Sequence, residues 1–426
     1  MILALLMIVT GYFVEPNVPT TLVYPPFGHC MGIYRAGTEQ LSMLLGGLVR
    51  FDNPQGMACV KLEEWDEPGT SDDDELAVYG VNSGSGHIIY NASMYTLGLY
   101  GENGSGSGGL LQPHGIAADP SGLVLVADTG NRRIVILRRN GSRLVPDGQL
   151  YGDFQEPWDV ALDGAGGIYV TDRAADRLYI FSSLSDTLPE IIEIDSPTGV
   201  DAVRDETWFH NDEKFVIVIT EDASSIVKLA QGEILAEADL ADCGGLHFNY
   251  PAIDFWGNVW VTDSISCSIH KFTDNIDYLC SFGSEGSGDR EFCFPTGLAI
   301  WKRYGQVFAA EGEGARYFWI GADIINPEIE PTGRGLQVNG TLTEPARVDA
   351  MIYDGDGEPV YRLAEGRYPA GEFHVGWEGT TSRGIPVPGG NYDLELVLHP
   401  LYSSKGYFSK TFTEEFTIDS HDIELR

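Results

Sequence analysis

Basic residues are scarce in this chain. It holds 26 Lys and Arg against 63 Asp and Glu, which gives a formal net charge of −37 at pH 7. A surface this acidic repels phosphate groups and anionic lipid head groups over the whole molecule. Nucleic acid is therefore not expected as a partner. The acidity by itself fits solubility at high salt and a divalent-rich exterior equally well, so it does not define a function.

A hydrophobic run long enough to cross a membrane is also lacking. Residues 2–14 are almost wholly apolar, but a helix of that length rises about 20 Å, short of the roughly 30 Å hydrocarbon core. The length suits a signal peptide, although no Lys or Arg precedes Arg35 and no A-x-A cleavage site is evident. The alternative is a buried N-terminal strand. We expect residues 1–22 to be a signal-peptide-like segment and linker, and the protein to be periplasmic, extracellular or at the cell surface.

Cysteine motifs that hold metals are missing. None of the six cysteines forms a C-x-x-C pair, so zinc ribbons and thioredoxin-like redox motifs are not supported. The even number is compatible with an oxidising compartment, and it leaves the pairing open. The chain also has no G-x-S-x-G nucleophile elbow.

Helix-length periodic runs are few, whereas glycine is abundant. The 426 residues include 52 glycines and 22 prolines, and 43 % of them are hydrophobic. This composition indicates a globular protein of roughly two or three domains. Many short strands joined by tight turns, and hence an all-β fold, are expected.

One unit recurs along most of the chain. Residues 112–137 (QPHGIAADPSGLVLVADTGNRRIVIL) and residues 156–181 (EPWDVALDGAGGIYVTDRAADRLYIF) share a pattern of short β-rich runs and turns. Aligning on the polar residue that ends the second run finds six copies, at Asn82, Asp128, Asp172, Glu221, Asp263 and Glu311. A period in the mid-forties built from strands is typical of four-stranded propeller blades.

These units resemble the NHL repeat, whose blades read roughly P-x-G-I-A-x-D and then x-G-x-h-h-V-A-D-T-x-N-x-R-I. The resemblance implies a six-bladed β-propeller over residues 23–323. The last unit provides three strands and ends near Asp323, without a fourth. Because an open ring would leave strand edges exposed, we expect residues 31–45 to supply the missing strand and close the propeller.

A second all-β domain is expected at residues 324–426. Pro327, Pro331, Gly333 and Gly335 predict a linker, and strands are expected at residues 335–342, 346–354, 359–363, 372–379, 391–398 and 415–419. This region resembles the FlgD-type immunoglobulin-like domain of exported bacterial proteins, through Ala370, Gly371, Trp377, Gly379, Gly384, Val387, Pro388, Gly390 and Tyr392. The resemblance implies a small antiparallel sandwich that acts as a non-catalytic module.

The residue after the repeat proline opens the innermost strand of each blade, near one mouth of the central channel. We take these residues as the candidate ligand-binding set: Gln55, His114, Trp158, Thr198, Asn249 and Thr296. In the similar peptidyl-amidoglycolate lyase, three histidines of this kind converge on zinc. Here only His114 occupies such a position, and His247 is a possible second ligand. We therefore assign no metal site and no catalytic residue, and we expect His114 to be a channel-lining side chain bonded to a neighbouring blade.

Other suggestive motifs favour structural roles. The six strand-ending polar residues are expected to bond the backbone of their own turns. Gly104, Gly106 and Gly109 satisfy G-x-G-x-x-G, but a strand follows them instead of a helix, which predicts an inter-blade loop and no phosphate site. The acid clusters at residues 72–75 and 354–358 lack the spacing of an EF-hand, so we expect no cofactor beyond weak calcium binding there.

The favoured interpretation is an exported, non-catalytic binding or scaffold protein that recognises a protein or glycan with its propeller face. Trp158 and Trp208 are candidate anchors for such a partner. The alternative is a metal-assisted lyase or hydrolase at the channel mouth around His114, acting on a small molecule. We lean against an enzyme, and the sequence leaves that question open.

Overall fold

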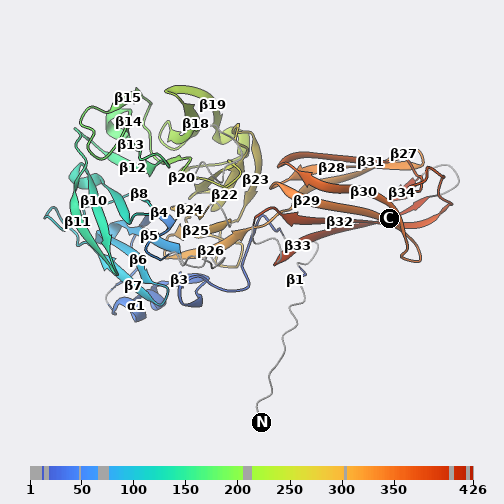
Figure 1. The fold of residues 1–426 in the computed structure, drawn as a ribbon, viewed down its shortest axis with the longest axis horizontal. Helices are drawn as coiled ribbons and strands as arrows, with labels where there is room; N and C mark the ends of the chain where they lie inside the picture. Colours follow the sequence, from blue (N-terminus) through green and yellow to red (C-terminus); the bar gives the residue numbers. More distant parts are fainter. Residues whose placement is uncertain are drawn as a thin grey trace, which may run out of the picture. The chain divides into compact units, whose positions relative to one another are not determined.

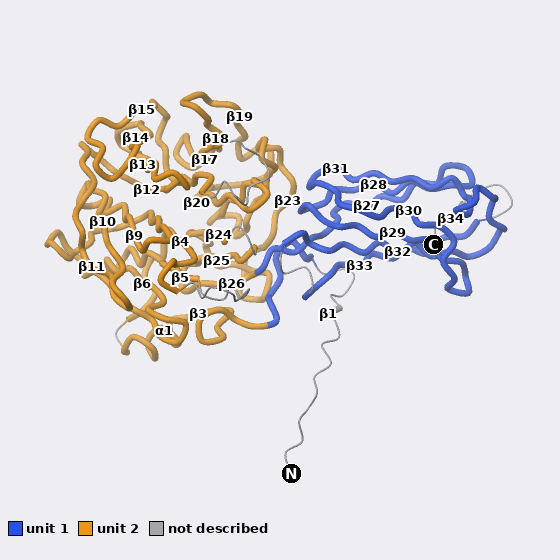
Figure 2. The backbone as a smooth tube through the Cα atoms, viewed as in Figure 1, with its two compact units in different colours: residues 1–26, 319–426 blue, residues 27–318 orange. Residues whose placement is uncertain are grey.

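The computed structural model describes residues 12–13, 19–47, 49–65, 76–204, 214–301, 305–402, 407–418 and 423–425. The chain divides into two compact units (Figure 2). One consists of residues 27–318, and the other of residues 1–26 and 319–426. Within the described ranges, no helix has the length and apolar character that crossing a membrane requires.

Four-stranded antiparallel sheets follow one another through the unit 27–318. The first sheet is β4 (Pro54–Lys61), β5 (Leu76–Asn82), β6 (His87–Ser93) and β7 (Thr96–Tyr100). The second is β8 (Ile116–Ala118), β9 (Leu123–Asp128), β10 (Arg133–Asn140) and β11 (Arg143–Gln149). The third is β12 (Pro157–Leu162), β13 (Ile168–Asp172), β14 (Arg177–Phe181) and β15 (Glu190–Glu193).

The series continues with the same strand order. The fourth sheet is β16 (Val200–Ala202), β17 (Val216–Thr220), β18 (Ser225–Ala230) and β19 (Glu233–Asp239). The fifth is β20 (Phe248–Ile253), β21 (Val259–Asp263), β22 (Ser268–Phe272) and β23 (Tyr278–Phe282). A sixth follows, with β24 (Leu298–Trp301), β25 (Gln306–Glu311) and β26 (Gly314–Ile320).

The innermost strands join these sheets into a ring. In the described residues β4 contacts β8, β8 contacts β12, and the contacts continue through β16, β20 and β24 back to β4. In Figure 1, β4, β8, β12, β20 and β24 lie toward the middle of this unit, and β7, β11, β15 and β19 lie toward its outside. The predicted all-β propeller is confirmed as a fold class.

A strand from the beginning of the chain completes the last sheet. β3 (Arg35–Gly37) pairs antiparallel with β26, with Ala36 opposite Ala315. The helix α1 (Thr38–Leu45) follows directly, a feature that the sequence pattern did not reveal. A short 3-10 turn η1 (Cys30–Gly32) precedes β3. The N-terminal segment thus joins the two ends of the ring.

Apolar side chains fill the spaces between neighbouring sheets. Between the first two sheets the core includes Tyr79, Tyr90 and Val126, all at most 4 % exposed. Phe154, Tyr179 and Phe181 lie between the second and third sheets. Buried aromatic area of this kind dominates core energetics, so the ring is rigid enough to hold the loops at its ends.

The second unit contains a β-sandwich. One sheet has three strands, β27 (Ile324–Thr332), β28 (Gly335–Leu342) and β31 (Gly371–Trp377). The other has the order β1 (Tyr12–Phe13), β33 (Phe408–Ile418), β32 (Gly390–Pro400), β29 (Ala346–Asp354) and β30 (Pro359–Tyr368), and β34 (Ile423–Leu425) also pairs with β33. Alternate residues of both sheets, such as Val338, Leu396 and Phe416, form one buried core.

The predicted linker at the start of this unit is wrong. The residues around Pro327 and Pro331 form the nine-residue strand β27. Proline is tolerated there because β27 is an edge strand and its register shifts between Ile325 and Glu328. Gly333, with φ of 69°, makes the hairpin turn to β28.

The N-terminal prediction is only partly within the described residues. Residues 1–11 and 14–18, which make up most of the predicted signal-peptide-like segment, lie outside them. Tyr12 and Phe13 pair in parallel with Phe408 and Ser409. β2 (Leu22–Val23) pairs with Trp319 and Ile320 in the same unit. The acid cluster at residues 72–75 and Trp208 also lie outside the described residues.

Candidate functional site

The predicted mouth residues occupy equivalent places in the six sheets. Gln55, Trp158 and Asn249 are the second residues of β4, β12 and β20. His114, Thr198 and Thr296 lie two residues before the first residues of β8, β16 and β24. Because strands alternate in direction within each sheet, the turn between the second and third strands lies at this same end. We call this end of the ring the mouth face.

The strand-ending acids hold the loops of the mouth face. The Asp172 carboxylate accepts hydrogen bonds from the backbone N–H groups of Gln155 (2.7 Å) and Glu156 (2.8 Å), which lie just before Trp158. Equivalent bonds run from Asp52 N to Asn82, from Leu111 N to Asp128, from Leu246 N to Asp263 and from Cys293 N to Glu311. The predicted bonds to the backbone N–H groups of the residue's own turn are found for Asp172 and Asp263. In five of the six blades the main contact is instead to the loop that leads to the mouth residue, which the prediction did not include.

Glu221 departs from this pattern. It lies one residue beyond β17, it has a φ of 52°, and its side chain is exposed. In the fourth blade the Thr220 hydroxyl donates to the Asp195 carbonyl at 2.6 Å and so takes over the contact to the entrance loop. At one of the six positions, a side-chain donor to a backbone carbonyl therefore replaces the side-chain acceptor.

The residue after each mouth residue is usually glycine, for a steric reason. A Cβ on Gly199 would lie 2.4 Å from the Asn249 carbonyl oxygen, and one on Gly297 would lie 2.1 Å from the Gln55 carbonyl oxygen. Glycine therefore lets neighbouring inner strands approach closely. The third and fifth blades carry Asp159 and Tyr250 at this position instead.

Asp159 and Tyr250 help to fill the channel, together with Asp201 and Arg204. Asp159 is 4 % exposed and accepts a hydrogen bond from Val200 N at 2.9 Å. Burial raises the pKa of Asp159 well above its usual range, and burial together with Asp159 raises that of Tyr250. The cavity that these side chains line has a volume of about 20 Å³, which is room for about one water molecule.

His114 is engaged with its neighbours. Its ring stacks on Trp158 with 4.0 Å between the centroids, and Nδ1 lies 3.0 Å from the Thr129 hydroxyl. The Arg173 guanidinium lies over the Trp158 ring at 5.0 Å and also pairs with Asp222. Burial lowers the pKa of His114 to about 4, and the Arg173 charge acts in the same direction. His114 is therefore neutral at pH 7.

Most of the remaining mouth residues are also engaged, two of them in bonds between blades. The Tyr250 hydroxyl donates to Gln55 Oε1 at 3.1 Å, the Asn249 amide donates to the His247 carbonyl at 3.3 Å, and the Thr296 hydroxyl donates to the Pro54 carbonyl at 2.8 Å. The Thr198 hydroxyl is buried without a partner. Among the described residues, no group of three or more His, Cys, Asp and Glu side chains could hold a metal ion. His114 and His247, the two possible metal ligands, therefore do not meet a carboxylate in such a group.

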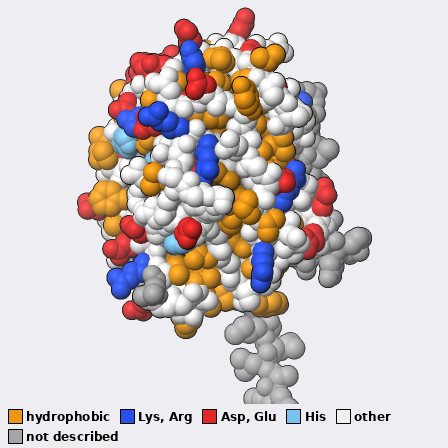
Figure 3. Space-filling view, turned by 90° about the vertical axis from the view of Figure 1, so that its left-hand side faces the viewer, with side chains coloured by type: hydrophobic (Ala, Val, Ile, Leu, Met, Phe, Trp, Pro, Cys, Tyr) orange, Lys and Arg blue, Asp and Glu red, His pale blue; other side chains and the backbone are white. Residues whose placement is uncertain are grey.

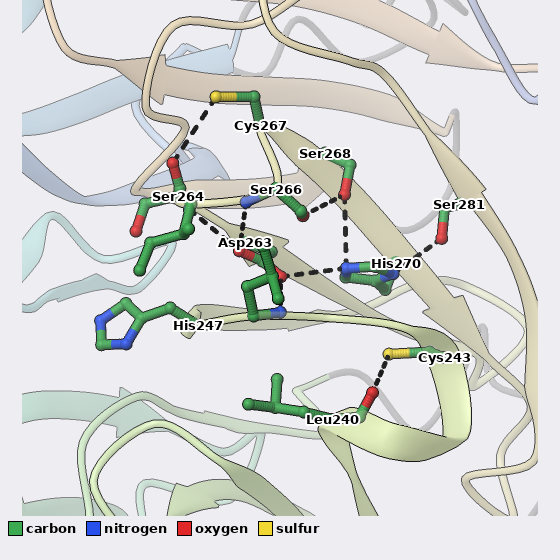
Figure 4. A network of polar contacts seen from close by, with 12 residues as sticks. Leu240, Cys243, His247, Asp263, Ser264, Ser266, Cys267, Ser268, His270 and Ser281 are labelled. Atoms are coloured by element: carbon green, nitrogen blue, oxygen red, sulfur yellow. Dashed lines mark hydrogen bonds and ion pairs between the residues drawn. The ribbon is translucent and has the colours of Figure 1, made fainter.

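A network under the fifth blade was missed by sequence reasoning (Figure 4). His270 on β22 has Nε2 3.3 Å from Asp263 Oδ2 and Nδ1 2.7 Å from the Ser281 hydroxyl. It also hydrogen-bonds to Cys243 of the short helix α2 (Leu240–Cys243). Although burial opposes a charge on the imidazole, the bonds to Asp263 and Cys243 raise the pKa of His270 to about 9.

The partner carboxylate is charged as well. Burial by itself raises the pKa of Asp263, but hydrogen bonds from His270 and from backbone N–H groups outweigh burial and hold that pKa well below its usual range. Asp263 and His270 are 0 % and 2 % exposed. They therefore form a buried ion pair at neutral pH. The Asp263 carboxylate is fully charged when it accepts the hydrogen bonds of the loops.

This network presents apolar side chains on the mouth face. Asp263 accepts from Leu246 N at 2.6 Å and from Ile265 N at 3.0 Å, so one carboxylate fixes both residues. Leu246 is 57 % exposed and Ile265 is 58 % exposed. Phe294, next to the Glu311-bound Cys293, is also 58 % exposed. We call Leu246, Ile265 and Phe294 the apolar anchors.

The glycine-rich loops are built as a repeat and bind the protein's own arginines. Gly104 N donates to Leu110 O, and Gly286 N donates to Phe292 O, each at 3.1 Å. The Arg133 guanidinium donates to the Gly109 carbonyl and pairs with Asp128, while Arg316 does the same with the Gly288 carbonyl and Glu311. Both are inter-blade loops, as predicted.

The acidic turn at residues 354–358 is a hairpin between β29 and β30. Asp354 Oδ1 accepts hydrogen bonds from Asp356 N and Glu358 N, each at 3.0 Å. The Asp354 carboxylate therefore stabilises the turn. Calcium binding there stays a prediction.

Comparisons with known proteins agree with this architecture. The NHL repeat family model matches residues 110–137, and the FlgD Ig-like domain model matches residues 327–399. The chain therefore contains an NHL repeat and a FlgD Ig-like domain. No curated protein matches the chain.

Solved structures with a similar chain trace include propellers of different activities. A streptogramin B lyase has 14 % identity, with 64 % of this chain and 94 % of that chain covered and a TM-score of 0.43. A gluconolactonase from Xanthomonas campestris has 12 % identity, 72 % and 99 % coverage and a TM-score of 0.47. PorZ, a surface component of the type-IX secretion system of Porphyromonas gingivalis, has 14 % identity, 85 % and 51 % coverage and a TM-score of 0.41.

Proposed function

We propose that the protein is an exported, non-catalytic binding or scaffold protein whose mouth face recognises another protein. The observation that carries this proposal is the set of apolar anchors, which lie exposed on loops that buried charges hold in place. Exposed apolar side chains on a rigid support are typical of interaction surfaces. NHL repeats commonly mediate protein interactions, which supports the same interpretation.

The filled channel supports binding at the surface over chemistry in the interior. A volume of about 20 Å³ among Asp159, Asp201, Arg204 and Tyr250 does not admit a small-molecule substrate. The Trp158 ring already contacts His114 and Arg173, so its faces are not free to stack on a sugar. Because two of the three apolar anchors, Leu246 and Ile265, are aliphatic, a protein partner is favoured over a glycan.

Charge alone does not identify the surface. Figure 3 shows one side of the unit 27–318, where hydrophobic, basic and acidic side chains are interspersed. The net charge of −37 is therefore not gathered into one acidic patch on that side. The expected binding energy comes from the anchors, while the surrounding charges affect encounter rates and salt dependence.

The proposal is tested with the full chain immobilised as wild type, as the double variant Leu246→Glu and Ile265→Glu, and as the control Leu188→Glu. Leu188 is 87 % exposed, in the β14–β15 connection at the opposite end of the ring. Partner capture from an outer-surface extract is expected to fall at least tenfold with the double variant and to be unchanged with the control. Equal capture by all three proteins contradicts the proposal.

Two further arms separate the alternatives. Protease digestion of the extract removes a protein ligand, and periodate oxidation removes a glycan, so the first treatment alone is expected to abolish capture. Metal content is measured by elemental mass spectrometry before and after dialysis against a chelator. One transition metal per chain, lost on His114→Ala, would overturn the binding-module interpretation in favour of a metal-assisted lyase or hydrolase.

A further inference from the structure

An apolar cavity lies where the first and last sheets of the ring meet. It has a volume of about 150 Å³, and it is lined by β4, β5 and β6 on one side, by β25 and β26 on the other, and by the segment from His29 to Leu41. Leu41, Phe308 and Tyr317 are among its lining side chains. The cavity belongs entirely to the unit 27–318.

Part of this space exists because Gly80, which lines the cavity, has no side chain. It lies in the middle of β5, with Met57 of β4 and Ile89 of β6 as its direct cross-strand neighbours, and all three line the cavity. A Cβ built on Gly80 meets no atom within 4 Å. By contrast, a Cβ on Gly98 of β7 would lie 2.4 Å from the Tyr90 ring.

The backbone does not require glycine at this position. Gly80 is not among the residues with positive φ, so any L-residue can adopt its conformation. Glycine inside a strand costs roughly 0.5–1 kcal/mol relative to alanine. The residue therefore keeps empty a space that a Cβ could enter without a clash.

The walls suit an uncharged guest. His29, which lines the cavity, has Nε2 3.1 Å from the Leu76 carbonyl, and burial lowers its pKa to about 4, so the ring is neutral at pH 7. Arg316 is 1 % exposed, and its charge is paired with Glu311 at 2.9 Å. Within the described residues, Arg316 Nη2 and His29 Nδ1 have no hydrogen-bond partner, but most of the lining side chains are apolar, which favours an uncharged guest.

We propose that this cavity binds a small neutral apolar molecule about the size of one six-membered ring. The volume is the basis for the size, because about 150 Å³ is the volume of an apolar cavity that accepts benzene or xenon. The chemistry of the walls is the basis for neutrality. None of the apolar anchors lines this site, although Pro54 and Asn82 at the mouth face do.

The test uses the full chain with benzene, near its aqueous solubility limit, and with benzoate as a charged counterpart. Benzene is expected to raise the Tm of wild type by roughly 2 °C through mass action, and benzoate is expected to leave it unchanged. Gly80→Leu fills the space, so its own Tm is expected to equal or exceed that of wild type and its benzene shift is expected to vanish.

Gly390→Leu is the matched control. Gly390 begins β32 in the other unit, and a Cβ there also meets no atom within 4 Å, so this variant is expected to keep the full benzene shift. Absence of a shift in wild type, or an equal shift in Gly80→Leu, overturns the proposal. If Gly80→Leu does not fold, Gly80→Ala and xenon NMR of wild type replace it, with a weakened benzene shift and a bound-xenon signal as the expected results.

Discussion

In the third and fifth blades, a carboxylate at the end of the second strand accepts hydrogen bonds from the backbone of the preceding loop, but its other partners differ. In the third blade Asp172 holds the loop before Trp158 through backbone N–H groups, and no histidine contacts its carboxylate in the described residues. In the fifth blade Asp263 holds the loop before Asn249 in the same way and also pairs with His270. Both blades have the same acceptor at this position, so the residues around it set the charge and exposure of the site.

The two regions differ in electrostatics as a result. His114, which stacks on Trp158 of the third blade, is half-buried, has no carboxylate partner among the described residues and is neutral at pH 7. His270 has a carboxylate partner and is charged. One ring therefore carries two histidines with opposite pH dependence, and two of the three apolar anchors, Leu246 and Ile265, lie in the blade with the ion pair.

The largest expected effect is the loss of Asp263. Asp263→Ala removes the partner of a buried imidazolium together with the bonds to Leu246 and Ile265, and it is expected to cost about 3–5 kcal/mol of unfolding free energy. Asp172→Ala removes backbone bonds alone and is expected to cost about 1–3 kcal/mol. Urea denaturation of both variants measures the difference. An equal loss would show that the ion pair adds nothing.

The second effect is on the alkaline side. The folded-state pKa of His270 is about 9, above the ordinary 6.5, so the folded state binds more protons between these two values. Its contribution, about 3 kcal/mol, is full below pH 6.5 and is lost as the pH rises through 9. The unfolding free energy of wild type minus that of His270→Gln is expected to shrink over this range. A difference that is constant with pH would contradict the assignment.

The third effect is on the acidic side and has the opposite sign. The folded-state pKa of His114 is about 4, below the ordinary 6.5, so the unfolded state binds more protons between these values. Its contribution is full above pH 6.5 and is lost as the pH falls toward 4, and it amounts to about 2 kcal/mol because the ring is only partly buried. His114→Gln is expected to flatten this limb in the same denaturation series.

A smaller effect is expected from the stacked pair. Trp158→Leu keeps an apolar side chain but removes the ring contacts to His114 and Arg173, at a cost of about 0.5–1.5 kcal/mol. Uncovering the imidazole also moves the pKa of His114 back toward its ordinary value. NMR titration of His114 measures that change, and an unaltered titration curve would mean that Trp158 does not shield the ring.

The smallest effect is expected at the anchors. Leu246 makes its positioning bond through backbone N–H, so Leu246→Glu is expected to change the unfolding free energy by no more than about 0.5 kcal/mol. Thermal denaturation checks this. A large loss of stability would place Leu246 in the core of the fold and would remove it from the argument for binding.

The repeat could be predicted from the sequence because it depends on residues that are close together in the chain. Polar residues such as Asp128, Asp172 and Asp263 end the second strands where the pattern placed them. Hairpin positions in the C-terminal domain were equally local, as at residues 354–358. The edge strand β27 was missed because proline was taken as a break, whereas a bulge at an edge accommodates it.

Long-range side-chain geometry was out of reach for the sequence. Asp263 and His270 belong to different strands, and their contact follows from a pairing register that no motif records. The cavity beside Gly80 was equally hidden, because an absent side chain has meaning only when its neighbours are known. Asp159 and Tyr250 did leave a signal, namely the two blades in which glycine is replaced after the mouth residue.

The pairing of β3 with β26 also has a consequence for the order of events during synthesis. Residues 35–37 leave the ribosome early, and their partners at residues 314–316 follow only after nearly all of the ring has been made, a delay on the order of tens of seconds. Closing so long a loop carries an entropic cost and makes the step slow. Until then the nascent chain keeps an unpaired strand edge, which gives chaperones a period in which the ring is still open.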